Sequence, residues 1–216
     1  ATTTVGCAHS AMMPRAISGP HGRVRTDHTL VLNGRPLTLH LAGEGRPAEL
    51  PLIMYTTGDG GWHRKDLAVY RQMLTWGYPL VAISAPEYLK PFSDAKTTTT
   101  PGALARDYAA ILVSAKAFLK LPADTPVILV GVSRGADLSV VAAGQGLLRR
   151  ELAGVVAVGL TREEEFVHRF RRSRVGARSP VRVATMMQVY EYLPRLGVIP
   201  ITIVQSTHDQ FLPADE

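Results

Sequence analysis

The segment that decides the fold is Val127-Ile128-Leu129-Val130-Gly131-Val132-Ser133-Arg134-Gly135-Ala136-Asp137. The apolar run before Gly131 predicts a buried strand, and the small and apolar residues after Ser133 predict a helix. Between them lies the pattern G-x-S-x-G, whose two glycines permit a sharp strand-to-helix turn. Such a turn raises the serine hydroxyl above the sheet and points the N-terminus of the helix at it. Ser133 is therefore a candidate nucleophile, and the alternative is a tight turn with a purely structural role.

Short apolar runs separated by helical patterns surround this segment, at residues 52–55, 80–84, 127–130, 155–158 and 201–204. This alternation is typical of a parallel sheet with crossover helices. One helix is predicted to end at Gly77, and another to begin with Thr100 as N-cap and Pro101 in its first turn. A third helix, following Ser133, is predicted to carry its apolar face as far as Leu147.

The N-terminal part of the chain has a different pattern. Residues 30–32 and 37–41 are predicted to form two antiparallel strands, because the intervening Asn33-Gly34 tolerates the positive φ angles of a tight hairpin. Residues 1–25 predict a flexible lead-in with no assigned function. The 216 residues are enough for one sizeable core, so we expect a single domain over 26–216 with a mostly parallel sheet and helices on both faces.

Composition narrows the functional classes only slightly. The single cysteine, Cys7, excludes an intrachain disulfide, and no apolar run approaches the roughly 20 residues needed to span a bilayer. Cys7 follows a segment similar to a lipoprotein cleavage site, although no charged start or apolar stretch precedes it. The net charge of +6 is concentrated between Arg162 and Arg182, so it does not predict a nucleic-acid partner.

A serine nucleophile requires N–H donors for the oxyanion that forms when it attacks a carbonyl group. One donor is expected from the main chain of Arg134. The second is expected from the glycine-rich loop after the 52–55 run, as the N–H of Asp59 or Gly60. Trp62 is expected to pack this loop or to form a wall of the substrate site. The alternative is an ordinary glycine-rich turn.

Asp209 is the candidate acid, because it lies in the loop after the 201–204 run and follows Ser133 in the chain. The alternative is a turn-forming aspartate close to a proline. No histidine follows Asp209, and His63, His168 and His208 are each better explained as surface or core residues. The simplest interpretation places the catalytic histidine beyond the end of the sequence, together with a last strand and helix of the sheet.

Residues 161–196 are expected to form a charged, lid-like insertion between the runs at 155–158 and 201–204. Glu163, Glu164 and Glu165 are followed there by an arginine cluster that includes Arg169, Arg171 and Arg172. Such a density of charge usually marks a solvated helix or loop. The alternative is a cap in which these arginines contact a phosphate-bearing substrate or an anionic membrane.

The glycine-tryptophan loop at 58–62, the turn at 131–137 and the spacing between them resemble the bacterial virulence protein family VirJ and its relative AcvB. The resemblance covers about residues 50–148, and beyond them the chain is similar to α/β-hydrolases only in general. It implies an α/β-hydrolase fold and a serine hydrolase exported to the periplasm, with members that act on aminoacyl esters of phosphatidylglycerol. Arg134 stands where a small or aromatic residue is frequent in such turns, which leaves the choice of substrate open.

Together these observations predict a serine esterase that forms an acyl-enzyme on Ser133 and acts on a small-molecule or lipid ester. No cofactor is expected, and no metal-ligand spacing is found in the sequence. The alternatives are a non-catalytic binding protein with this fold, or an acyltransferase or thioesterase that uses the same site. If the protein is not exported, the cytoplasm is the remaining location.

Overall fold

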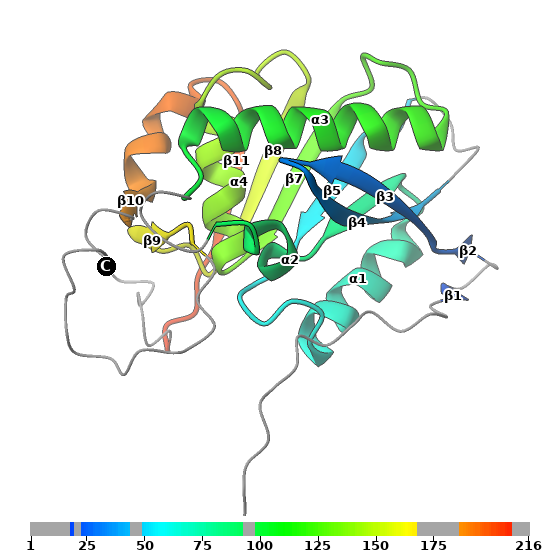
Figure 1. Ribbon diagram of the computed structural model, residues 1–216, viewed down its shortest axis with the longest axis horizontal. Helices are drawn as coiled ribbons and strands as arrows, with labels where there is room; N and C mark the ends of the chain where they lie inside the picture. Colours follow the sequence, from blue (N-terminus) through cyan, green and yellow to red (C-terminus); the bar gives the residue numbers. More distant parts are fainter. Residues whose placement is uncertain (1–17, 20–22, 44–48, 93–97, 168–185, 209–216) are drawn as a thin grey trace, which may run out of the picture.

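The centre of the computed structural model is a seven-stranded sheet with the order β11-β8-β7-β5-β6-β4-β3 (Figure 1). The structure describes residues 18–19, 23–43, 49–92, 98–167 and 186–208. The five strands from β11 to β6 are parallel, while β4 is antiparallel to β6 and to β3, so the predicted mostly parallel sheet with an N-terminal hairpin is confirmed. The strands are β3 Thr26–Leu32, β4 Arg35–Ala42, β5 Leu52–Thr56, β6 Leu80–Ile83, β7 Val127–Val132, β8 Leu152–Val158 and β11 Ile201–Val204.

Helices cover both faces of this sheet. They are α1 Arg64–Trp76, α2 Ala85–Leu89, α3 Pro101–Leu119 and α4 Arg134–Gly144, with the 3₁₀ helices η1 Val189–Tyr192 and η2 Pro194–Leu196. Two short antiparallel pairs lie outside the sheet, β1 Ser18–Gly19 with β2 Arg23–Val24 and β9 Glu163–Glu165 with β10 Met186–Gln188. In the part of the chain that the structure describes, no helix combines the length and apolarity that crossing a bilayer requires.

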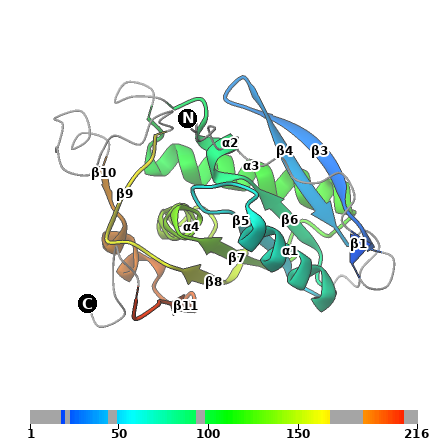
Figure 2. The same cartoon turned by 90° about the horizontal axis from the view of Figure 1, so that it is seen from below.

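Alternation along the strands divides the core between the two faces. In β5, Leu52 and Met54 join the cluster built with α2, α3 and α4, whereas Ile53 and Tyr55 join the cluster built with α1. Because all five residues of β5 are buried, this strand lies at the centre of both clusters. Figure 2 shows α1 on one side of the sheet and α3 and α4 on the other.

Local sequence signals account for most of these boundaries. Asn33 and Gly34 have φ angles of 51° and 72°, as the predicted tight hairpin requires. Gly77 ends α1 in the left-handed conformation, and the Thr100 side chain accepts a hydrogen bond from the first turn of α3. The prediction for Leu147 was wrong, because α4 ends at Gly144 and the Leu147 side chain is 55% exposed.

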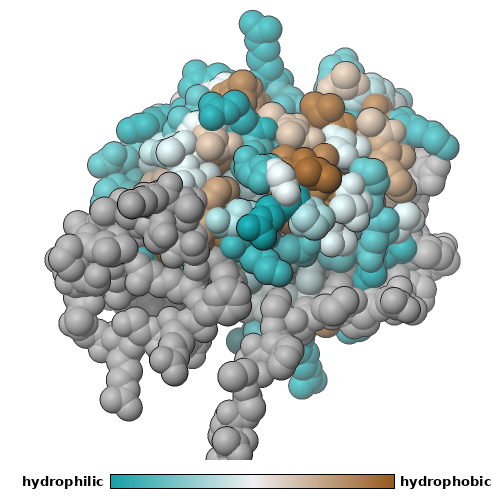
Figure 3. All heavy atoms as spheres, viewed as in Figure 1, coloured by the Kyte–Doolittle hydropathy of each residue, from teal (hydrophilic) through white to brown (hydrophobic). Residues whose placement is uncertain are grey.

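The structure describes only part of the predicted lead-in and of the predicted insertion. The predicted lead-in over residues 1–25 contains β1 and β2, and the side chain of Arg25 is buried. The predicted insertion at 161–196 contains β9, β10, η1 and η2, while residues 168–185 lie outside the described part. On the face drawn in Figure 3, apolar residues occur in small groups among hydrophilic ones.

Candidate active site

Ser133 occupies the turn between β7 and α4 in an unusual backbone conformation. Its φ of 52° and ψ of −127° lie in a region that residues with a side chain rarely adopt, as expected for a strained nucleophile turn. The turn is held because the Ser133 N–H donates to the Val158 carbonyl at 2.7 Å and the Ala136 N–H donates to the Ser133 carbonyl at 2.7 Å. Ser133 is exposed, and its hydroxyl makes no hydrogen bond to any residue that the structure describes.

The two glycines of the motif are required by close approaches of the main chain. A Cβ atom at Gly131 would overlap the carbonyl group of Gly135. A Cβ atom at Gly135 would overlap the carbonyl oxygens of Thr56 and Thr57 at the end of β5. Side chains at these two positions would therefore push the start of α4 away from the sheet and displace Ser133.

The glycine-rich loop after β5 lies against the nucleophile turn. A Cβ atom at Gly58 would lie 3.4 Å from the Cβ of Ser133. The Gly58 N–H donates to Asp66 at 3.3 Å, and the Gly61 N–H donates to the Gly58 carbonyl at 3.0 Å. Within the described ranges, the N–H groups of Asp59 and Gly60 have no acceptor. These predicted oxyanion donors therefore remain available beside Ser133.

Arg134 supplies the other predicted donor from the first position of α4, where a helix leaves its N–H groups without an intrahelical acceptor. The helix also directs its positive end toward Ser133. Donors from the start of α4 and from the loop after β5 thus approach Ser133 from two adjacent strands, since Thr56 pairs with Gly131. This arrangement is suited to stabilising a negatively charged oxygen next to the serine.

The aromatic side chains of the loop have different environments. Trp62 is 3% exposed, and its ring lies 5.0 Å from the ring of His40 and 5.6 Å from that of Tyr70. These contacts are those of a residue that packs the loop onto β4 and α1. His63 is exposed at the N-cap of α1, and its ring lies over Gly60.

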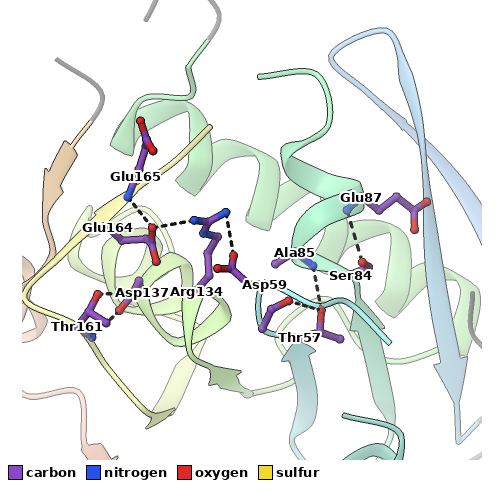
Figure 4. Close-up of polar contacts among 11 residues, drawn as sticks. Thr57, Asp59, Ser84, Ala85, Glu87, Arg134, Asp137, Thr161, Glu164 and Glu165 are labelled. Atoms are coloured by element: carbon purple, nitrogen blue, oxygen red, sulfur yellow. Dashed lines mark hydrogen bonds and ion pairs between the residues drawn. The ribbon is translucent and has the colours of Figure 1, made fainter. Parts of the chain in front are cut away.

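The side chain of Arg134 connects three parts of the site (Figure 4). Its Nη1 lies 2.8 Å from Asp59 in the loop after β5, and its Nη2 lies 2.9 Å from Glu164 in β9. Glu164 also accepts a hydrogen bond from the Glu165 N–H at 2.7 Å. Burial raises the pKa of Glu164, although Arg134 opposes this effect. The guanidinium therefore joins the glycine-rich loop to β9 above the start of α4.

Asp137, one turn into α4, is fully buried below this network. It accepts hydrogen bonds from the Thr161 N–H and the Thr161 hydroxyl, both at 3.0 Å. Burial raises the pKa of Asp137 well above its ordinary value, and the negative charge of Glu164 adds to the effect. The Thr161 hydroxyl also lies 3.0 Å from the Glu163 carbonyl, so its single proton cannot serve both oxygens. A protonated Asp137 would resolve this conflict.

Several candidate residues lie outside the described residues. These are Asp209, His168, Arg169, Arg171 and Arg172, so their predicted roles stay predictions. His208 is exposed, and its ring contacts the neighbouring Thr207 hydroxyl at 3.0 Å. Among the described residues, no group of three or more His, Cys, Asp or Glu side chains is arranged to hold a metal ion.

Two residues that shape the site were not singled out by the sequence. Asp66 accepts hydrogen bonds from the Tyr55 hydroxyl at 3.0 Å and the Gly58 N–H at 3.3 Å, and so fixes the start of the glycine-rich loop. Glu164 was grouped with the solvated charges of the insertion, yet its side chain is 16% exposed and pairs with Arg134. Neither position carries a local signal, because each partner lies in another element.

A strained serine between a buried strand and a helix, facing a glycine-rich loop on a mostly parallel sheet, defines an α/β-hydrolase fold. Residues 51–170 match the family described as "Bacterial virulence protein (VirJ)", and the chain belongs to this family. No curated protein sequence gave a match.

Solved structures support the same fold at low sequence identity. A putative dienelactone hydrolase from Klebsiella pneumoniae subsp. pneumoniae MGH 78578 has a TM-score of 0.62 at 15% identity, covering 89% of this chain and 76% of its own. Est1E from Butyrivibrio proteoclasticus has a TM-score of 0.60 at 16% identity, covering 88% and 81%. A cold-adapted esterase from an Arctic intertidal metagenomic library has a TM-score of 0.59 at 11% identity, covering 89% and 75%.

Proposed function

We propose that the protein is a serine hydrolase that cleaves a carboxylic ester through an acyl-enzyme on Ser133. The observation that carries this proposal is the exposed Ser133, held at a φ of 52° beside free N–H groups of the glycine-rich loop and the start of α4. Backbone strain of this kind is typical of functional sites, which favours a catalytic role over a purely structural turn. The esterase and hydrolase names of the similar structures agree with the proposal.

In the proposed reaction, the Ser133 Oγ forms a bond to the ester carbonyl carbon as a histidine takes the hydroxyl proton. The carbonyl oxygen becomes negatively charged and accepts hydrogen bonds from the N–H groups of Arg134 and of Asp59 or Gly60. The bond to the leaving oxygen then breaks as that oxygen receives the proton. Water attacks the acyl-serine in the same way, which releases the carboxylic acid and restores the serine.

The proposed reaction also needs a general base that accepts the Ser133 proton. Asp209 is proposed to orient a catalytic histidine and to stabilise its cationic form. Neither His63 nor His208 hydrogen-bonds Ser133: the His63 ring lies over Gly60, and His208 contacts Thr207. A histidine other than these two is therefore proposed as the base.

Membership of the VirJ family favours an aminoacyl ester of phosphatidylglycerol as the substrate and the periplasm as the location. A lipid substrate would also suit contact of Arg169, Arg171 and Arg172 with an anionic membrane. A binding protein without turnover, or an acyltransferase or thioesterase at the same site, is the competing function. The fold is common to all of these, so the reaction itself must separate them.

The decisive experiment is labelling of the protein with a fluorophosphonate probe, together with hydrolysis of a soluble ester and of lysyl-phosphatidylglycerol. We expect Ser133 to be labelled, and Ser133→Ala to abolish both labelling and turnover. Ser139→Ala is a matched control, because the Ser139 hydroxyl is buried in α4 and donates to the Gly135 carbonyl. Full esterase activity in Ser133→Ala would refute the nucleophile, and a folded protein with neither labelling nor turnover would favour the binding function.

A further inference from the structure

The two expected oxyanion donors are joined by a side-chain contact as well as by the sheet. The first donor is the main-chain N–H of Arg134, and the second belongs to Asp59 or Gly60 in the loop after β5. The Arg134 guanidinium lies 2.8 Å from the Asp59 carboxylate. Arg134 therefore provides the first donor with its main-chain N–H, and its side chain contacts the loop that provides the second.

From this geometry we propose that Arg134 is a positioning residue, whose ion pair with Asp59 sets the place of the second oxyanion donor. The proposal rests on the proposed hydrolase function and assigns a new role within that site. The contact thus gives a physical role to the arginine that follows the nucleophile.

The other described hydrogen bonds of the loop do not involve Asp59 or Gly60, although the His63 ring packs over Gly60. Asp66 holds the Gly58 N–H, and the Gly58 carbonyl holds the Gly61 N–H, so these contacts bracket Asp59 and Gly60. Burial does not fix Asp59 either, because its side chain is 60% exposed. Of the described contacts, the ion pair with Arg134 is the one that restrains the Asp59 side chain.

Arg134 is itself fixed on its second side. Its side chain is 19% exposed, and its Nη2 lies 2.9 Å from Glu164, whose oxygen also accepts the Glu165 N–H. A planar guanidinium that binds two carboxylates has little freedom to swing, unlike the single ammonium of a lysine. Asp59 is therefore held against a rigid partner rather than a mobile surface charge.

Loss of this contact should affect the reaction more than the fold. A half-exposed ion pair contributes little to the free energy of unfolding. Oxyanion donors, by contrast, stabilise the transition state only when they lie close to 3 Å from the developing charge, and a displacement of about 1 Å costs up to about a hundredfold in rate. The expected signature is a loss in kcat with little change in KM.

The test compares Asp59→Ala, Arg134→Met and the double variant with wild type, on a soluble ester. We expect each single variant to lower kcat by about ten- to a hundredfold with KM within about threefold, and the double variant to be no worse than the more affected single variant. Asp59→Asn, which keeps a neutral acceptor, should recover part of kcat. Because Asp59 is exposed, Asp59→Ala keeps the test valid even if Arg134→Met fails to fold.

The matched control removes an ion pair far from Ser133. Lys116 in α3 lies 2.6 Å from Glu151, which precedes β8 at the opposite end of the parallel strands. Glu151→Gln should leave kcat unchanged even where it lowers the melting temperature. An equal loss of kcat in Glu151→Gln would show that the measured effect is general destabilisation, and would overturn the proposal.

A second measurement does not depend on turnover. Hydrogen–deuterium exchange over residues 57–63 should be faster in Asp59→Ala and Arg134→Met than in wild type, and unchanged in Glu151→Gln. If wild type lacks activity that depends on Ser133, the proposed function fails, while faster exchange still supports the positioning contact. Unchanged exchange, or a kcat within twofold of wild type in Asp59→Ala, would overturn the role of Arg134.

Discussion

Gly135 and Thr56 are in such close contact that a Cβ atom at Gly135 would overlap the Thr56 carbonyl oxygen. The contact joins the first turn of α4 to the end of β5, the strand that carries the glycine-rich loop. It therefore couples the two elements that are expected to bind the oxyanion. The sequence motif shows that a glycine is needed here, and the structure shows which atoms require it.

Gly135→Ala should damage both stability and activity. Overpacking against main-chain atoms that have no alternative rotamer costs roughly 1–3 kcal/mol or more, and it would move Ser133 away from the loop. We expect a lower melting temperature and a loss of the proposed esterase turnover.

Gly102→Ala is the matched control for Gly135→Ala. Gly102 lies in the first turn of α3, and a Cβ atom there would approach only the Arg106 side chain, at 3.6 Å. An alanine in a helix should stabilise the protein by up to about 1 kcal/mol. Equal melting temperatures for the two variants would contradict the close approach of Gly135 to β5.

Asp137→Asn should change how stability depends on pH. An aspartate in the unfolded chain titrates near pH 4, roughly, while burial raises the pKa of Asp137 in the folded protein. Between these two pH values the folded protein retains a proton that the unfolded chain has lost, so the free energy of unfolding falls as the pH rises. Asp137→Asn removes this titration, and an asparagine amide could donate to the Thr161 hydroxyl.

Urea unfolding at several pH values between 5 and 8 would measure this difference. Relative to wild type, Asp137→Asn should gain in free energy of unfolding as the pH rises, because only the wild-type folded protein retains the proton. Asp124→Asn, at an exposed aspartate, should follow the wild-type curve. Parallel curves for wild type and Asp137→Asn would show that the buried carboxyl does not hold a proton.

Neutralising Arg169, Arg171 and Arg172 together should weaken binding to vesicles that contain phosphatidylglycerol. Each basic residue close to an anionic surface contributes about 1 kcal/mol, and the contribution is screened by salt. Cosedimentation at low and high salt measures the change, while turnover of a small soluble ester should remain near the wild-type level. The matched control neutralises three exposed basic residues of α1, namely Arg64, Lys65 and Arg71. Equal vesicle binding by the two triple variants would show that the arginine cluster has no specific role in membrane contact.

The sequence predicted those turns and helix ends that depend on the residues at the turn itself. The hairpin at Asn33-Gly34 and the end of α1 at Gly77 depend on backbone conformations that single residues favour. The strand-to-helix turn at Ser133 is marked instead by the two glycines that its close main-chain contacts require. The end of α4 could not be predicted in this way. A Cβ atom at Gly144 would lie 2.8 Å from the Tyr192 side chain, so α4 ends where it meets a distant segment.

The site was predictable to a similar extent. Ser133 and the loop around Asp59 could be named because glycines mark both turns in the sequence. The partner of Arg134 could not, because Glu164 lies 30 residues further along and belongs to a run of glutamates that resembles a solvated surface. Asp209 and the arginine cluster remain predictions from sequence alone.

The pairing of Thr56 with Gly131 has a consequence for how the site could change during evolution. The loop and the nucleophile turn leave the sheet from adjacent positions on two central strands, and both strands are packed on either side. The bases of the two turns are therefore fixed by the sheet, provided that Gly131 and Gly135 are retained. Selection could replace Arg134 or lengthen the loop to suit a new substrate without moving the serine, so that a single framework would support a succession of specificities.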